Sequence, residues 1–310
     1  MVRRAWSRVT IGALVLTMCS AGSAWAEVQP DAPWGLARIS QRAPVGPGPW
    51  HYSYDSSAGQ GVDVYVVDTG IDIEHPELRG RTVWLANLSG DGMDKDCNGR
   101  GTHLAGIVGG TTYGVAKKVT LLAVKVAGCD GTATTKALIE GIKRATASAR
   151  SAGRPSVMLI GPTQQRDDAV NQAVNDAAEA GVAVVAPVGD DSKDACNSSP
   201  ASANRAVTVG ATTKDDKFLP TSNNGPCMHL LGPGEDIASA WIGGTGATRA
   251  QSGTAMAAAH AAGLTAYFIK LHGRMAPSRL RHMLQSYSTK GKVTGVPSGP
   301  NYLLFNNFQK

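Results

Sequence analysis

The sequence predicts an α/β fold in which helices cover both faces of a central, mostly parallel β-sheet. Short runs rich in β-branched residues alternate with longer segments of helical periodicity. That alternation is typical of strands joined by crossover helices. No repeat or Pro/Gly-rich linker interrupts the pattern, and the length suits one large α/β domain. We therefore expect a single domain over residues 27–310.

The elements follow in chain order from these patterns. Five β-branched runs are expected as strands, at 62–67, 121–126, 157–160, 182–186 and 206–210. Three segments with helical spacing are expected as helices, at 135–149, 168–180 and 254–271. A further helix at 277–286 begins with Pro277, which suits a first helical turn, and we expect it to pack on the outside.

Residues 1–26 have the pattern of a secretory signal peptide. Arg3, Arg4 and Arg8 precede a short apolar run, and small residues at Ala24 and Ala26 flank Trp25 as a cleavage signal. The apolar run is too short to span a bilayer, and no later segment is long enough. The sequence predicts a secreted, extracellular protein without a membrane anchor.

Charge and cysteine content indicate which partners and which covalent modifications the protein can have. The formal net charge of +6 includes three arginines of the signal segment, and no basic block suggests a nucleic-acid partner. Four cysteines remain after residue 26, an even number that predicts two disulfides in an oxidising compartment, with three pairings open. Asn87 and Asn197 begin N-x-S sequons and are candidate glycosylation sites.

Three motifs resemble those of the subtilisin-like serine proteases (peptidase S8), closest to the proteinase K branch. Residues 66–71 read VVDTGI, residues 98–106 read NGRGTHLAG, and residues 252–260 read SGTAMAAAH. The similarity extends from residue 31 to residue 306. It implies a subtilisin-like three-layer fold and a triad order of Asp, His and Ser.

The resemblance assigns the triad positions to Asp68, His103 and Ala255. Asp68 and His103 are expected to form the carboxylate–imidazole couple, whereas Ala255 stands where the family has its nucleophilic serine. Arg100 replaces the histidine usual before Gly-Thr-His, and His260 is interpreted as a packed helix residue. Only residues 27–30 separate the expected cleavage site from the family's mature start, so no prodomain is expected.

The resemblance also locates an oxyanion position and a substrate groove. Asp190 takes the place of the family's amide donor, and a carboxylate cannot donate a hydrogen bond unless it is protonated. One groove wall is expected at Gly131, Thr132 and Ala133. The other wall is expected at Gly161, Pro162 and Thr163, where the proline removes an N–H and the threonine adds bulk.

Pairings and ligands are likewise implied by the resemblance. It favours the disulfides Cys97–Cys129 and Cys196–Cys227, each closing a loop of about 30 residues. Calcium is a candidate ligand, but the position after strand 206–210 carries Thr212 and Thr213, with Asp215 and Asp216 nearby; the sequence gives no set of six to eight oxygens. We expect a monomer with a protein or peptide ligand.

The leading functional hypothesis from the sequence is a catalytically inactive protease homologue that acts by binding or regulation. Two alternatives stay open. One is an active secreted serine endopeptidase with a non-standard nucleophile. The other is a non-proteolytic enzyme that uses Asp68, His103 and Asp190 as acid/base groups on a small molecule.

Overall fold

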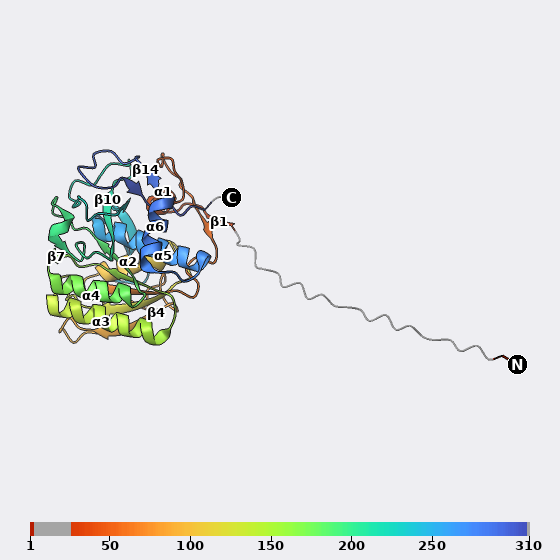
Figure 1. The fold of residues 1–310 in the computed structure, drawn as a ribbon, viewed down its shortest axis with the longest axis horizontal. Coiled ribbons are helices and arrows are strands. Elements are labelled where there is room, and N and C mark those ends of the chain that lie inside the picture. The colour runs from red at the N-terminus through yellow and green to blue at the C-terminus, as the bar shows by residue number, and fades with distance from the viewer. Residues whose placement is uncertain (3–25, 309–310) are drawn as a thin grey trace.

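Nine strands form the central sheet of the molecule. The computed structural model describes residues 1–2 and 26–308 (Figure 1). The strand order is β14-β15-β11-β10-β8-β6-β3-β5-β4, and every neighbouring pair is parallel except β14 with β15. The strands are β3 (Asp63–Asp68), β4 (Thr82–Asn87), β5 (Thr120–Lys125), β6 (Ser156–Ile160), β8 (Ala183–Pro187), β10 (Val207–Thr212), β11 (Leu230–Pro233), β14 (Thr289–Lys290) and β15 (Tyr302–Leu303). The predicted mostly parallel α/β sheet is confirmed. The expected signal segment falls almost entirely outside the described residues.

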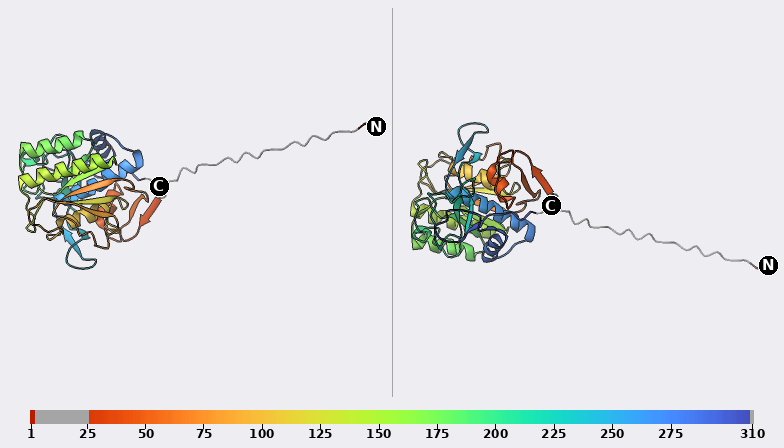
Figure 2. Two further views of the ribbon diagram at one scale, coloured as in Figure 1. Left: turned by 90° about the horizontal axis from the view of Figure 1, so that it is seen from below. Right: turned by 90° about the horizontal axis from the view of Figure 1, so that it is seen from above.

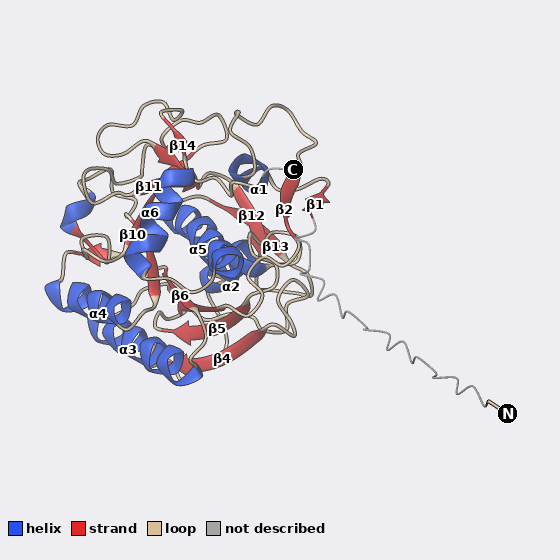
Figure 3. Cartoon of the chain, turned by 45° about the vertical axis from the view of Figure 1, so that its right-hand side comes forward, coloured by secondary structure: helices blue, strands red, loops and turns tan. Residues whose placement is uncertain are grey.

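Helices cover both faces of the sheet. On one face, α3 (Thr135–Ala152) and α4 (Asp168–Glu179) lie side by side (Figure 3). On the other, α2 (Arg100–Gly109) packs against α5 (Thr254–His272), which is buried from residue 254 to residue 269. α6 (Pro277–Tyr287) packs against α5 from outside, and α1 (Trp34–Ile39) contacts β11. Each face of the sheet has its own apolar core.

Three short ribbons complete the fold. β1 (Ala26–Gln29) pairs with β2 (Tyr52–Asp55), and β7 (Gln164–Gln165) pairs with β9 (Ser198–Ser199), which follows a 3₁₀ turn at Ala195–Asn197. β12 (Ile237–Ala240) and β13 (Thr248–Gln251) form a hairpin whose loop projects from the body in both views of Figure 2. Among the described helices, none combines the length and the apolar character needed to cross a bilayer.

The local sequence explains where the major helices start. The Thr134 hydroxyl accepts from the Ala137 amide ahead of α3, and the Asp167 carboxylate accepts from the amides of Ala169 and Val170 ahead of α4. Such side-chain caps satisfy N–H groups that lack a partner inside the helix. α2 and α5 instead begin after Gly99 and Gly253, with positive φ, and their first turns point toward one cleft.

Candidate functional site

A polar cleft of about 470 Å³ lies where several strands of the sheet end. Asp68, Gly161 and Asp190 lie at or just beyond the carboxyl ends of β3, β6 and β8. In open parallel sheets, ligands usually bind beyond these ends. The cleft is lined by Arg100, Gly131, Thr132, Ala133, Gly161, Pro162, Thr163, Gln164, Asp190, Gln251, Ser252, Gly253, Ala255 and Met256.

Arg100 is the partner of Asp68. Its Nε lies 2.9 Å and 3.0 Å from the two carboxylate oxygens, and its Nη2 donates to the carbonyl oxygen of Gly131 at 3.1 Å. The Asp68 side chain is fully buried, whereas that of Arg100 is 27% exposed. Burial raises the pKa of Asp68, and the guanidinium opposes that rise. Arg100 thus ties the end of β3 to one wall of the cleft.

Two glycines allow this close approach. A Cβ at Gly101 would overlap the carbonyl oxygen of Gly70, and a Cβ at Gly161 would overlap the Asp68 carboxylate. Because neither residue has a side chain, the first turn of α2 and the end of β6 pack directly against the end of β3.

The expected Asp68–His103 couple is wrong. His103 is buried one helical turn beyond Arg100, and its Nε2 lies 2.8 Å from the carbonyl oxygen of Ile237 and 3.1 Å from that of Arg249. Since both neighbours are acceptors, Nε2 carries the proton. Burial lowers the pKa of His103 to about 4, so the ring is neutral at pH 7. His103 therefore anchors the β12–β13 hairpin and does not line the cleft.

Arg100 is the cleft residue whose role sequence reasoning missed. The signal was present, because Arg100 occupies the position of the histidine usual before Gly-Thr-His. In the structure this position, and not position 103, faces the Asp68 carboxylate. A base at residue 100 would lie in the cleft with residue 255, but arginine stays protonated and cannot serve as one.

Asp190 and Ala255 do lie together in the cleft. The Asp190 carboxylate accepts from the Thr254 amide at 2.9 Å and from the Thr254 hydroxyl at 3.0 Å. Partial burial raises the pKa of Asp190, and the two Thr254 hydrogen bonds act against that rise. Ala255, the second residue of α5, contributes a methyl group, and its amide has no hydrogen-bond partner among the described residues.

All six residues expected in the substrate groove line this cleft. Gly131, Thr132 and Ala133 form one side, and Gly161, Pro162 and Thr163 form the other. That the cleft binds a polypeptide stays a prediction. Of the four positions assigned by the triad and oxyanion motifs, only Asp190 and Ala255 line the cleft.

The remaining predicted residues lie away from the cleft or at its edge. Both disulfides are confirmed, with Cys97 bonded to Cys129 and Cys196 bonded to Cys227. His260, as expected, is packed in its helix with 2% exposure.

Of the two aspartates near the candidate calcium position, Asp216 already has a positive partner, because Arg38 donates to both of its carboxylate oxygens, at 2.7 Å and 3.0 Å. Calcium binding at this position stays a prediction. Of the two sequon residues, Asn87 is half-buried and Asn197 is exposed, and their glycosylation stays a prediction.

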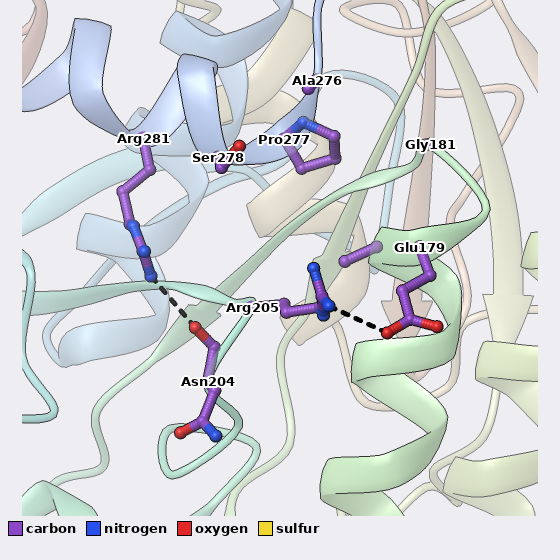
Figure 4. A pocket seen from close by; sticks show the side chains of 9 residues that line it. Glu179, Gly181, Asn204, Arg205, Ala276, Pro277, Ser278 and Arg281 are labelled. Carbon is purple, nitrogen blue, oxygen red and sulfur yellow. Dashed lines mark hydrogen bonds and ion pairs between the residues drawn. The ribbon is translucent and has the colours of Figure 1, made fainter.

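A second pocket, of about 520 Å³, lies between α4, α6 and the segment before β10 (Figure 4). Arg281 donates to the carbonyl oxygen of Asn204, and Arg205 forms an exposed ion pair with Glu179 at 3.0 Å. Each guanidinium thus has a protein acceptor, and the pocket shares no residue with the cleft.

The fold is that of a subtilisin-like protein, and the comparisons agree. The subtilase family model (Peptidase_S8) matches residues 59–300, and the chain belongs to this family. It is 44% identical over 284 residues to Proteinase T of Parengyodontium album, covering 90% of this chain and 94% of that protein. It is 41% identical to the Cuticle-degrading protease of Metarhizium anisopliae, covering 90% of this chain and 71% of that protein.

A comparison with a solved structure also supports the subtilisin-like fold. The crystal structure of a cold adapted subtilisin-like serine proteinase superposes with a TM-score of 0.85 at 37% identity, covering 90% of this chain and all of that one. The relatives that match over nine-tenths of the chain are named proteases. These findings contradict the hypothesis of a catalytically inactive homologue that acts by binding or regulation, and they favour peptidase activity.

Proposed function

We propose that this protein is a secreted, monomeric peptidase that hydrolyses extended polypeptides in the cleft between Gly131–Ala133 and Gly161–Thr163. The proposal departs from the family's serine chemistry, because position 255 carries alanine. Water is the nucleophile, and Asp190 is its general base. The observation that carries the proposal is the carboxylate of Asp190 lying in one cleft with an unpartnered backbone amide, in a chain whose relatives are named proteases.

Asp190 suits the role of base. Of the titratable side chains that line the cleft, it is the one that can accept a proton at neutral pH, since Arg100 stays charged. A raised pKa makes its carboxylate a stronger base than an ordinary aspartate. The two hydrogen bonds from Thr254 fix the carboxyl group at the start of α5.

Two donors are available for the negative charge that develops on the substrate. The amide of Ala255 lies in the first turn of α5, where N–H groups lack intrahelical partners and the helix dipole favours an anion. The Nη1 group of Arg100 has no hydrogen-bond partner among the described residues. Donors fixed before the reaction lower the barrier because they need no reorganisation.

The reaction balances without a cofactor. Asp190 takes a proton from water as the oxygen adds to the carbonyl carbon of the scissile bond, which forms a tetrahedral oxyanion. The intermediate collapses, the C–N bond breaks, and the proton held by Asp190 passes to the leaving amine. The products are a carboxylic acid and an amine, and Asp190 returns to its ionised form; the acid then gives its proton to the amine, which leaves a carboxylate and an ammonium group.

The groove would hold substrate mainly by its backbone. Gly131 and Gly161 leave main-chain groups accessible, as in other proteins that bind an extended peptide beside a sheet-like edge. Pro162 has no N–H, and the Gly131 carbonyl oxygen already accepts from Arg100, so fewer main-chain bonds are available than on a free edge.

The test is hydrolysis of casein and of a library of internally quenched peptides by purified protein. We expect turnover that Asp190→Asn lowers by about 10²–10⁴-fold. Asp191→Asn is the matched control, because Asp191 is the adjacent carboxylate and does not line the cleft. A fluorophosphonate should not inhibit the activity. Absence of turnover, or equal turnover in the Asp190 variant, would overturn the proposal.

A further inference from the structure

A small pocket lies apart from the cleft, between α1, β12 and α5. Its volume is about 210 Å³. Three aromatic side chains line it, from Trp34, Trp50 and Tyr113, with the backbone of β12 at Ile237 and Ala238. In Figure 3, α1 and β12 lie near each other on the side of the molecule that also carries β1 and β2. It shares no residue with the catalytic cleft.

His260 gives this pocket a polar group. The side chain is 2% exposed, and its Nδ1 lies 2.9 Å from the carbonyl oxygen of Met256. Because a carbonyl only accepts, Nδ1 carries the proton and Nε2 is a bare acceptor. Nε2 has no hydrogen-bond partner among the described residues. Burial lowers the pKa of His260 to about 4, so this nitrogen stays unprotonated at pH 7.

Gly35 leaves the acceptor accessible from the pocket. A Cβ at this position would lie 2.6 Å from His260 Nε2 and would cover it. Gly35 lies in α1, and its φ does not require a glycine. The glycine is therefore explained by the space that it leaves open in front of His260 Nε2, and not by its backbone conformation.

The shape and chemistry of the pocket specify its ligand. Aromatic walls favour a planar ring, which stacks or packs edge to face. A ligand that covers Nε2 without donating to it leaves this acceptor unpaired, which is costly, so a ligand that donates to Nε2 gains over one that does not. A cavity of about 150 Å³ holds benzene, so the volume here suits one ring with a polar substituent, or a small fused ring.

We propose that this pocket binds a small aromatic molecule with an O–H or N–H donor, of the phenol or indole class, which donates to Nε2 of His260. The ring lies among Trp34, Trp50 and Tyr113. Asp236 stands exposed at the rim, where its carboxylate favours a neutral or cationic substituent over an anionic one. This proposal does not depend on the peptidase mechanism.

The pocket is structurally linked to the cleft. Ile237 lines the pocket and is the register partner of Gln251, which lines the cleft. The carbonyl oxygen of Ile237 also accepts from His103. One short ribbon therefore forms a wall of each site.

The test is a titration of the purified full chain with phenol, indole and toluene. Binding is measured by calorimetry and by the ¹⁵N chemical shifts of the histidine rings. Toluene has nearly the shape of phenol and lacks the donor. We expect saturable binding of phenol and indole with Kd of about 1 mM or tighter. Toluene should bind about tenfold more weakly. Phenol should shift Nε2 of His260, assigned with His260→Gln.

Ala238→Leu is the blocking variant. Ala238 is exposed on β12 and lines the pocket, so the larger side chain should close the entrance without disturbing the core. We expect it to abolish phenol binding. Ala250→Leu is the matched control, because Ala250 is exposed on β13, pairs with Ala238 and does not line the pocket. Equal affinity for phenol and toluene, binding retained in Ala238→Leu, or no saturable binding at all would each overturn the proposal.

Discussion

The Nε–H of Arg100 donates to both oxygens of the Asp68 carboxylate, with Nε–O distances of 2.9 Å and 3.0 Å. A fully buried carboxylate is thereby neutralised at the end of β3, and no imidazole takes part. The pair also fixes the Gly131 wall through Arg100 Nη2. Arg100 thus joins the end of β3 to the Gly131 wall of the cleft.

Breaking the Arg100–Asp68 pair should destabilise the fold. Arg100→Met leaves a buried carboxylate without its positive partner, so we expect a loss of about 3–5 kcal/mol in the free energy of unfolding. The double variant Asp68→Asn with Arg100→Met should recover most of that loss, because no buried charge remains. Urea unfolding of the two single variants and the double variant measures the coupling. Additive effects would show that the pair contributes nothing.

Restoring a serine alone should not restore serine chemistry. In Ala255→Ser the new hydroxyl shares the cleft with Arg100, which cannot accept its proton, and His103 is held by the carbonyl oxygens of Ile237 and Arg249. Asp190 is then the one base left in the cleft, and the imidazole that Asp68 would orient in the serine mechanism is missing. We expect labelling by a fluorophosphonate to be far slower in Ala255→Ser than in the double variant with Arg100→His, whose imidazole replaces the guanidinium beside Asp68. Labelling of Ala255→Ser alone, in a form that also needs His103, would contradict this geometry.

Much of the fold could be predicted from sequence because its central strands are buried throughout. Strands β3 and β6 show as continuous apolar runs, and their observed limits differ from the prediction by one residue. The edge strand β4 was missed, since five of its six side chains are only partly buried and Val83 is 51% exposed. α2 was also missed, because three glycines interrupt its helical pattern.

The site could be predicted only in part. Motif resemblance brought Asp190, Ala255 and the groove residues to one cleft, as the structure does. It failed for His103, because the motif has two candidate positions one helical turn apart, and the histidine of this chain stands at the one that does not face Asp68. The close approach of Gly161 to the Asp68 side chain and the Arg100 contact with Gly131 join distant segments and need the three-dimensional fold.

Stability should fall in mild acid through the buried histidines. The pKa values of His103 and His260 are lowered to about 4 in the fold, below the ordinary value of about 6.5. Between these two pKa values the unfolded chain therefore binds more protons than the folded chain does. The contribution of the two histidines to the free energy of unfolding is full above pH 6.5 and is lost as the pH falls toward 4. We expect the free energy of unfolding to drop by about 2 kcal/mol per histidine between pH 7.5 and 5.

Urea unfolding at the two pH values measures this loss. Ring signals of His103 and His260 should stay in the neutral form over the same range while the protein remains folded. An unfolding free energy that stays constant or rises on acidification would contradict the lowered pKa values of His103 and His260 in the folded protein.

The buried ammonium group of Lys125 should stabilise the loop that precedes α2. Its side chain is fully buried, its Nζ lies 2.6 Å from Asp91, and it donates to the carbonyl oxygens of Met93 and Lys95. Lys125→Met leaves these acceptors unpaired, so we expect a loss of about 3 kcal/mol and faster amide exchange over residues 88–97. Lys143→Met is the control, since Lys143 is 64% exposed. Unchanged exchange in the loop would contradict the role given to Lys125.

The most direct test of the account is the pH dependence of kcat/KM for one quenched peptide, measured with the native protein and with Asp190→Asn. We expect turnover that rises with pH as Asp190 loses its proton, with an apparent pKa above that of an ordinary aspartate because burial raises it. We also expect a rate about 10²–10⁴-fold lower for the variant. Turnover by the native protein that never exceeds that of Asp190→Asn at any pH would contradict the account.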